Sequence, residues 1–189
     1  MEVVQPIRDI NQIEAIKKIL KSSNLRDYCL FTVGINSALR IGDLLKLNIG
    51  DVADDNMKPI EKISLREQKT QKLKEFPLGK TSIKALREYL ATRKNCKPAD
   101  PLFPSRKGGV PMTRVQAYRI IRDAAKSVGI TDRIGSHTLR KTFGYHAYRQ
   151  GKDITIVQKL LNHSSPGDTL SYIGITQDDL DNVYLTLNL

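Results

Sequence analysis

Apolar residues recur every three or four positions along most of this chain, which is the spacing of a buried helix face. Ile13, Ile16 and Leu20 begin the pattern, and it returns in several later segments. Residues 62–78 are the exception, because polar and apolar residues alternate there as they do in strands. No internal repeat, low-complexity tract or Gly/Ser-rich linker interrupts the chain. The sequence therefore predicts one mainly α (α+β) domain over residues 1–189, with one small antiparallel hairpin.

Capping residues set the expected bounds of the elements. Asn11 with Glu14, and Thr113 with Gln116, have the spacing of a capping box at a helix start, and Gly151 suits a helix end. The expected helices cover residues 11–21, 25–37, 41–47, 80–94, 137–150 and 154–161, the last capped by Asp153, with one more opening at Thr113 and a final one from Thr176. The expected strands cover residues 62–66 and 72–78, and residues 162–168 are expected to be loop.

The length, composition and cysteine content of the chain exclude several classes of protein. A chain of 189 residues with 40% hydrophobic residues can bury one core of its own. The N-terminus has no secretion signal, and no apolar run approaches the roughly 20 residues that span a bilayer, so we expect a cytoplasmic protein with no membrane partner. Cys29 and Cys96 form no C-x-x-C pair, so neither a zinc site nor a disulfide is expected.

The charge of the chain points to a polyanion as its partner. There are 31 Lys and Arg residues against 20 Asp and Glu residues, a net charge of +11. Residues 58–97 hold twelve of the basic residues and four of the acidic ones, a local charge of +8. Such an excess favours DNA by releasing counterions from phosphates, and Arg66, Lys72, Lys74 and Lys141 are the expected DNA contacts. On composition alone, a basic surface that merely faces water stays an open alternative.

Five short segments carry residue types that suit chemistry on a phosphodiester. A single Arg, His or Tyr is far more often structural than catalytic, so the order and spacing of the segments must decide. They are SALRIGDLLKL with Arg40, EQKTQKLKEFPL with Lys69, SHTLRKTF with His137 and Arg140, IVQKLLNHSS with His163, and TLSYIGI with Tyr172, nine residues after His163.

Over about residues 25–175, these segments resemble the catalytic domain of the tyrosine recombinases, also called phage integrases. That family presents Arg, Lys, His-x-x-Arg, His or Trp, and Tyr in this order. The resemblance implies a helical domain that cleaves and rejoins DNA through a 3′-phosphotyrosyl bond to Tyr172, for integration or excision of mobile DNA. It also implies double-stranded DNA as substrate, a homo-oligomer that is tetrameric on DNA, possible accessory DNA-binding proteins and a nucleoid-associated location.

The residue types fit this chemistry on their own terms. Attack on a phosphodiester builds negative charge on its nonbridging oxygens, and the guanidinium groups of Arg40 and Arg140 can each bind two such oxygens. A phosphoester of Tyr172 keeps the bond energy for religation, so no ATP or other cofactor is expected. Two-metal nucleases need clustered carboxylates, which these segments lack, so no metal is expected either.

Proton transfer needs further groups. By resemblance to the hairpin lysine of the family, Lys69 is the expected acid that protonates the 5′-hydroxyl leaving group, although Lys72 or Lys74 stays open as an alternative. His137 and His163 are expected to bind the phosphate and to assist proton transfer at Tyr172. Asp43, three residues after Arg40, is expected to orient that arginine.

The chain also departs from the family pattern. Typical members carry an N-terminal core-binding domain that is absent here, so we expect either a fragment or a naturally short recombinase. Asn162 stands where Gly is usual, and Lys141 where His is frequent. Residues 176–189 are expected to form a helix that docks on a neighbouring protomer, with packing on its own chain as the alternative. A type IB topoisomerase and a noncatalytic DNA-binding regulator remain the competing functions.

Overall fold

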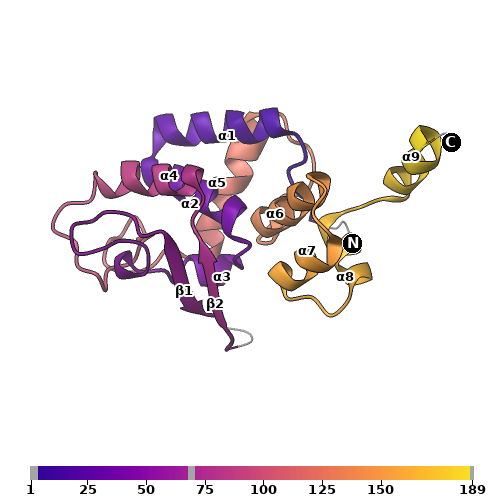
Figure 1. Cartoon of the computed structure of the whole chain (residues 1–189). Coiled ribbons are helices and arrows are strands. Elements are labelled where there is room, and N and C mark those ends of the chain that lie inside the picture. The colour runs from indigo at the N-terminus through magenta and orange to yellow at the C-terminus, as the bar shows by residue number, and fades with distance from the viewer. Residues whose placement is uncertain (1–3, 68–70, 188–189) are drawn as a thin grey trace.

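The computed structural model describes residues 4–67 and 71–187. Within them the chain is mostly helical and has one two-stranded antiparallel sheet, as the sequence predicts (Figure 1). The helices are α1 (Ile10–Ser23), α2 (Leu25–Ser37), α3 (Ile41–Leu44), α4 (Lys80–Leu90), α5 (Arg114–Ser127), α6 (Thr138–Arg149), α7 (Ile154–Leu161), α8 (Pro166–Ile173) and α9 (Gln177–Leu187), with a short 3-10 helix at Ile49–Asp51. The strands are β1 (Lys62–Arg66) and β2 (Leu73–Pro77), and Ser64 pairs with Glu75 at the centre of the ladder.

Helix α2 forms the centre of the main core. It packs against α1, α4 and α6, and its side chains Leu30, Phe31 and Val33 are fully buried. Fully burying such a side chain contributes roughly 1.5–3 kcal/mol, so a helix buried on every side fixes the position of the residues after it. The chain turns sharply just beyond α2, because Ala38 adopts a left-handed conformation with φ of 53°. This corner leads directly into Arg40, the N-cap residue of α3.

A second, smaller cluster joins α7 and α8 to α6, and Figure 1 shows the three helices together on one side of the molecule. Its buried members include Val157, Leu161 and Ile173. Gly144 of α6 lies against this cluster, and a Cβ atom there would meet Ile173 Cγ2 at 2.7 Å and Leu161 Cδ1 at 2.9 Å. The close approach of α6 to α7 and α8 therefore depends on glycine at this position.

Local capping explains where the predicted bounds hold and where they fail. Helix α2 and strand β1 have the predicted bounds, and the capping box of Thr113 at α5 is confirmed. The predicted capping box at Asn11 is wrong, because Asp9 caps α1 and accepts a hydrogen bond from the Asn11 backbone N–H. The prediction of loop through residue 168 is also wrong, because Pro166 opens α8 at a position where a missing N–H has no cost.

Four other elements are shorter than predicted, and β2 and α6 differ by only one residue at each end. Helix α3 ends at Leu44 rather than at residue 47, and α4 ends at Leu90 rather than at residue 94. None of the described helices is both long and apolar enough to cross a membrane.

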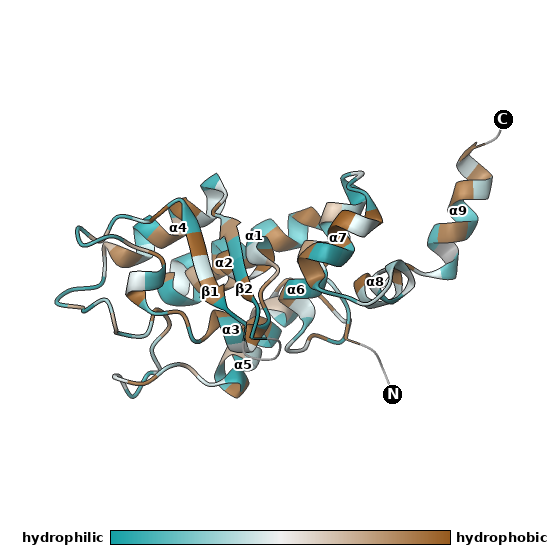
Figure 2. Cartoon of the chain, turned by 60° about the horizontal axis from the view of Figure 1, so that its bottom comes forward, coloured by the Kyte–Doolittle hydropathy of each residue, from teal (hydrophilic) through white to brown (hydrophobic). Residues whose placement is uncertain are grey.

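Helix α9 stands apart from the other elements in both views (Figures 1 and 2). On its apolar face, Leu180 is 47% exposed, Val183 is 55% exposed and Tyr184 is 83% exposed. Packing of this face on its own chain, the alternative from the sequence, is therefore not seen in this structure.

Candidate active site

The first turn of α6 meets α8 at the predicted nucleophile. His137 is the N-cap residue of α6, and its Nδ1 lies 3.0 Å from the Tyr172 hydroxyl oxygen. Arg140 is three residues further along, so both side chains leave the same face of the helix. Tyr172 is partly buried, whereas His137 is exposed. The structure thus brings a phenol, an imidazole and a guanidinium group together at a point that a large substrate can reach.

His163 approaches Tyr172 from the end of α7. The chain turns there at Asn162, which adopts a left-handed conformation with φ of 48° and caps the helix. The His163 ring is nearly perpendicular to the Tyr172 ring, with 4.6 Å between the ring centroids. His163 Nδ1 lies 3.2 Å from Thr169 Oγ1, so Nε2 is the ring nitrogen that can turn toward a ligand. Both predicted histidines therefore lie beside the predicted nucleophile.

Arg140 ties the site to two corners of the backbone. Its side chain is buried, and its guanidinium group donates to the carbonyl oxygens of Ala38 and Leu161. These carbonyls lie at the corner after α2 and at the last residue of α7. Since both ends of the guanidinium group are held, Arg140 presents a fixed positive charge beside Tyr172. Arg40 adds a second: burial raises the pKa of Tyr172, and the charges of Arg140 and Arg40 both oppose that rise.

Arg40 has an acidic partner that was not predicted from the sequence. Arg40 Nη1 forms an ion pair with Glu67 Oε1 at 3.0 Å, and Glu67 directly follows β1. Asp43, which was expected to orient Arg40, is buried nearby and acts electrostatically on Lys74 and Arg140. The Asp43 assignment thus stays a prediction. No sequence signal linked Arg40 to Glu67, because their contact depends on how the hairpin packs on α3.

The basic residues of the hairpin divide into two groups. Lys69 lies outside the described residues, so its predicted role stays a prediction. Arg66 and Lys72 are exposed, as a DNA contact requires. Lys74 instead turns inward and donates to the carbonyl oxygens of Ala38, at 3.4 Å, and Leu160, at 3.2 Å. Burial, and then the charge of Arg140, lowers the pKa of Lys74 to about 8.

Lys141 lies in a different environment from the one predicted for a DNA contact. It is 5% exposed, and its ammonium nitrogen lies 4.8 Å from the centroid of the Tyr172 ring. A cation over an aromatic face is attracted by the negative electrostatic potential of the ring. In this structure Lys141 therefore faces the nucleophile rather than solvent.

The environment sets the protonation of the site. Loss of solvent raises the pKa of Tyr172, and the charges of Arg140 and Arg40 act in the opposite direction. Loss of solvent, and then the charge of Arg140, lowers the pKa values of His137 and His163 below the ordinary 6.5. Both imidazoles are then neutral at pH 7, so His137 can accept a proton from the phenol that it contacts.

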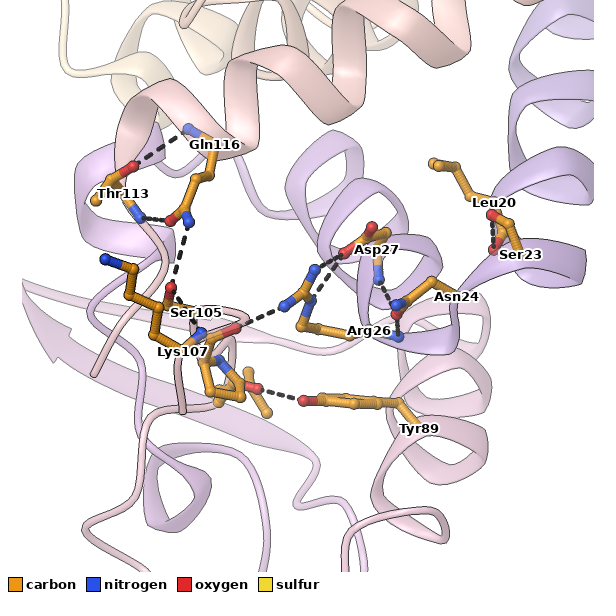
Figure 3. A network of polar contacts seen from close by, with 12 residues as sticks. Leu20, Ser23, Asn24, Arg26, Asp27, Tyr89, Ser105, Lys107, Thr113 and Gln116 are labelled. Carbon is orange, nitrogen blue, oxygen red and sulfur yellow. Dashed lines mark hydrogen bonds and ion pairs between the residues drawn. The ribbon is translucent and has the colours of Figure 1, made fainter. Parts of the chain in front are cut away.

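A cleft of about 450 Å³ opens beside these residues, and it reveals a further arginine. Its lining includes Arg40, Gly42, Arg114 and His137. Arg114 is the first residue of α5, and the capping box of Thr113 holds the start of that helix (Figure 3). Its guanidinium group packs on Gly42, where an added Cβ atom would meet Nη2 at 2.5 Å. Arg114 was not predicted from the sequence, although its position after a predicted cap could have marked it as a residue at a helix start.

Comparisons with known proteins agree with this geometry. A family model described as the phage integrase family matches residues 8–178. The chain is 44% identical over 178 residues to the probable integrase/recombinase YoeC of Bacillus subtilis (strain 168), covering 94% of this chain and 93% of that protein. It is 31% identical over 166 residues to the tyrosine recombinase XerC of Thermodesulfovibrio yellowstonii, covering 84% of this chain and 53% of that protein.

The fold agrees as well. The crystal structure of XerA recombinase superposes with a TM-score of 0.78 at 26% identity, covering 100% of this chain and 65% of that one. The chain therefore spans nearly all of YoeC but only about half of XerC.

Proposed function

The chain belongs to the phage integrase family, and we propose on that premise that it is a site-specific DNA recombinase with Tyr172 as its nucleophile. One observation carries the assignment of the nucleophile. The Tyr172 hydroxyl oxygen lies 3.0 Å from His137 Nδ1, beside the guanidinium group of Arg140. The substrate in this proposal is double-stranded DNA, and we propose that the protein acts on the nucleoid in the cytoplasm.

In the proposed reaction, each bond that forms replaces a bond that breaks. The Tyr172 oxygen attacks the phosphorus and passes its proton to His137, while the bond from phosphorus to the 5′ oxygen breaks. Arg40 and Arg140 bind the nonbridging oxygens as charge builds on them. His163 donates a further hydrogen bond in the tautomer that carries its proton on Nε2, in which Nδ1 accepts from the Thr169 hydroxyl group. The 5′ oxygen leaves with a proton from a lysine, and the 3′ phosphate stays on tyrosine. Attack by the 5′-hydroxyl of a partner strand reverses these steps, so neither ATP nor a metal ion enters the balance.

A trapping experiment tests the nucleophile. In a nicked duplex the short 5′-hydroxyl strand diffuses away after cleavage, so a covalent adduct accumulates. A pool of such duplexes with a randomised segment allows the cleaved sequence to be read from the adduct. We expect an adduct with the native chain, none with Tyr172→Phe, and an unchanged yield with the matched control Tyr118→Phe, at a partly exposed tyrosine of α5 that the proposed reaction does not use.

The other outcomes of this experiment are equally informative. Absence of any adduct across the pool would contradict the proposal and would fit a noncatalytic DNA-binding protein. Relaxation of supercoiled plasmid without strand exchange would instead fit a type IB topoisomerase.

The leaving-group acid has two candidates. Lys69 is proposed from the family resemblance, and Lys74 has the support of its place beside Arg140 and its pKa of about 8. A substrate with sulfur in place of the 5′ bridging oxygen separates them, because a thiolate leaves without being protonated. We expect Lys69→Ala to cleave the ordinary substrate slowly and the sulfur substrate at the native rate. If Lys74→Ala is the variant that is rescued, Lys74 is the acid and the Lys69 assignment is wrong.

The remaining contacts with DNA are proposed from exposure and charge. Arg66 and Lys72 on the hairpin and Arg114 at the cleft are exposed cations near the site, so they can bind phosphates that flank the scissile one. We also propose that α9, with its exposed apolar face, docks on a neighbouring protomer in a homo-oligomer on DNA.

A further inference from the structure

Lys141 is a buried cation that the proposed reaction does not use. It lies in the first turn of α6, directly after Arg140, and its side chain and backbone are together only 5% exposed. Placing an ammonium group among protein atoms is costly unless something compensates its charge. The compensating group that the structure shows is the Tyr172 ring, whose centroid lies 4.8 Å from Lys141 Nζ. A buried lysine thus contacts the face of the nucleophile.

The other contacts of Tyr172 leave room for such a role. His137 Nδ1 lies 3.0 Å from the hydroxyl oxygen and Arg140 also contacts the hydroxyl group, but contacts at the end of the side chain do not by themselves set the tilt of the ring. The tilt depends on groups that touch the ring itself. The rings of His163 and His137 approach it edge to face, at centroid distances of 4.6 Å and 6.0 Å, and Lys141 lies over one face. Because His137 and Lys141 are four residues apart on one helix, the same turn of α6 holds both the hydroxyl group and the ring.

We propose that Lys141 is a positioning residue, whose ammonium group holds the Tyr172 ring in the orientation from which the hydroxyl group attacks phosphorus. The proposal rests on Tyr172 being the nucleophile. It replaces the DNA contact that the sequence predicted for Lys141, and the two roles affect different steps. A DNA contact contributes to binding, whereas a positioning residue contributes to cleavage of DNA that is already bound.

The first experiment separates these steps. Lys141→Met keeps an unbranched side chain of similar length without the charge, and Lys141→Arg keeps the charge. With a nicked duplex at saturating concentration, we expect Lys141→Met to form the adduct about tenfold more slowly, the order of a lost cation–π contact, and Lys141→Arg to recover most of the rate. The dissociation constant for uncleaved DNA should be unchanged in both variants. Weakened binding with a native cleavage rate would overturn the proposal and restore the DNA contact.

A second measurement needs no DNA and no activity. The chain labelled with 3-fluorotyrosine gives a fluorine resonance for each tyrosine, and the one missing from Tyr172→Phe belongs to Tyr172. We expect Lys141→Met to shift and broaden that resonance, and Lys141→Arg to leave it near its native position. Lys152→Met, at an exposed lysine, is the control that should change nothing.

The spectrum also keeps the two proposals apart. An unchanged Tyr172 resonance in Lys141→Met would overturn the positioning role, whether or not the native chain cleaves DNA. If the native chain forms no adduct but the resonance shifts as expected, then the proposed reaction fails while the contact stands. Should Lys141→Met not fold, Lys141→Gln takes its place in both measurements.

Discussion

His137 contacts the phenol that must lose a proton, so its own protonation should govern the rate. Loss of solvent and the charge of Arg140 lower its pKa below the ordinary 6.5, which means that the neutral form persists to a lower pH than in a free histidine. We therefore expect the cleavage rate to be level near neutral pH and to fall only below pH 6.5. Single-turnover rates of adduct formation between about pH 5 and pH 8 measure this fall in the cleavage rate.

Replacement of the imidazole checks the assignment. His137→Asn should lower the cleavage rate near neutral pH by about 10²–10⁴-fold, the usual contribution of a positioned base. It should also remove the fall in rate at low pH. If the rate of His137→Asn still falls at low pH as in the native chain, another group is responsible for the pH dependence. His163 would be the next to test, because its pKa is lowered for the same reasons.

Gly42 and Arg114 form a pair in which the smaller residue places the larger one. A Cβ atom on Gly42 would lie 2.5 Å from Arg114 Nη2, so Gly42→Ala must displace the guanidinium group from the cleft. We expect Gly42→Ala and Arg114→Ala to weaken DNA binding by a similar factor, about tenfold each. The double variant should be no weaker than either single one, because both remove the same contact. Additive losses in a DNA-binding titration would show that Gly42 acts independently of Arg114.

At the scale of elements, the packing of α6 on α7 and α8 sets where Tyr172 lies. Gly144→Ala would bring its new methyl group to 2.7 Å from Ile173 Cγ2, one residue from the nucleophile. We expect a loss of about 1–3 kcal/mol in the free energy of unfolding, the usual cost of overpacking, together with slower cleavage. Thermal or urea unfolding measures the first effect and adduct formation the second.

Gly167→Ala is the matched control for that change. Gly167 lies in the first turn of α8, and its nearest atom to an added Cβ is Ser165 Oγ at an ordinary 3.8 Å. Since alanine favours helix over glycine, this variant should be neutral or more stable by up to about 1 kcal/mol. An equal loss in Gly167→Ala, where an added Cβ meets no atom closer than 3.8 Å, would contradict overpacking against Ile173 as the cause of the loss in Gly144→Ala.

Local patterns predicted the elements because the signals that end and begin helices act over a few residues. Thr113 with Gln116 marked the start of α5, and Asp153 marked the start of α7. Two of the errors arose where two signals competed over the same short distance. Asp9 caps α1 ahead of Asn11, and Pro166 opens a helix inside the predicted loop.

The site was predictable to the extent that its parts are local or repeat a known order. His137 and Arg140 are three residues apart on one helix, so their common face can be predicted from the sequence. Contacts between residues of different helices and strands could not be predicted in this way. The ion pair of Arg40 with Glu67 depends on how the hairpin packs, and the burial of Lys141 against Tyr172 depends on the angle between α6 and α8. Neither distance nor burial is encoded by residue spacing along one element.

For the whole molecule, the charge of +11 should make DNA binding strongly dependent on salt. Each phosphate contact contributes about −0.9 to the slope of log K against log salt concentration for duplex DNA. We expect Arg66→Ala, Lys72→Ala and Arg114→Ala each to make that slope less steep by about 1, and Lys141→Met to leave it unchanged. Binding titrations at several salt concentrations give these slopes, and a native affinity that is insensitive to salt would contradict a DNA-facing basic surface.

The apolar face of α9 is exposed in a single copy of the chain, and the packing of that copy does not explain why the face is apolar. Val183 and Leu187 are 55% and 61% exposed, so a charge there should not change the stability of the monomer by more than about 0.5 kcal/mol. If the face docks on a neighbouring protomer, Val183→Asp should instead reduce assembly on DNA, because it buries a charge among apolar side chains. Mass measurement of the protein–DNA complex in solution reports the number of bound protomers.

Asn182→Asp is the control for this substitution, since it adds the same charge to α9 at an exposed position outside the apolar face. We expect it to assemble like the native chain. If both variants assemble alike, the apolar face of α9 is not an interface between protomers, and the contacts that join copies on DNA must lie within the body of the domain. If only Val183→Asp loses protomers while its isolated chain melts at the native temperature, the exposed apolar residues of α9 are accounted for by a second copy.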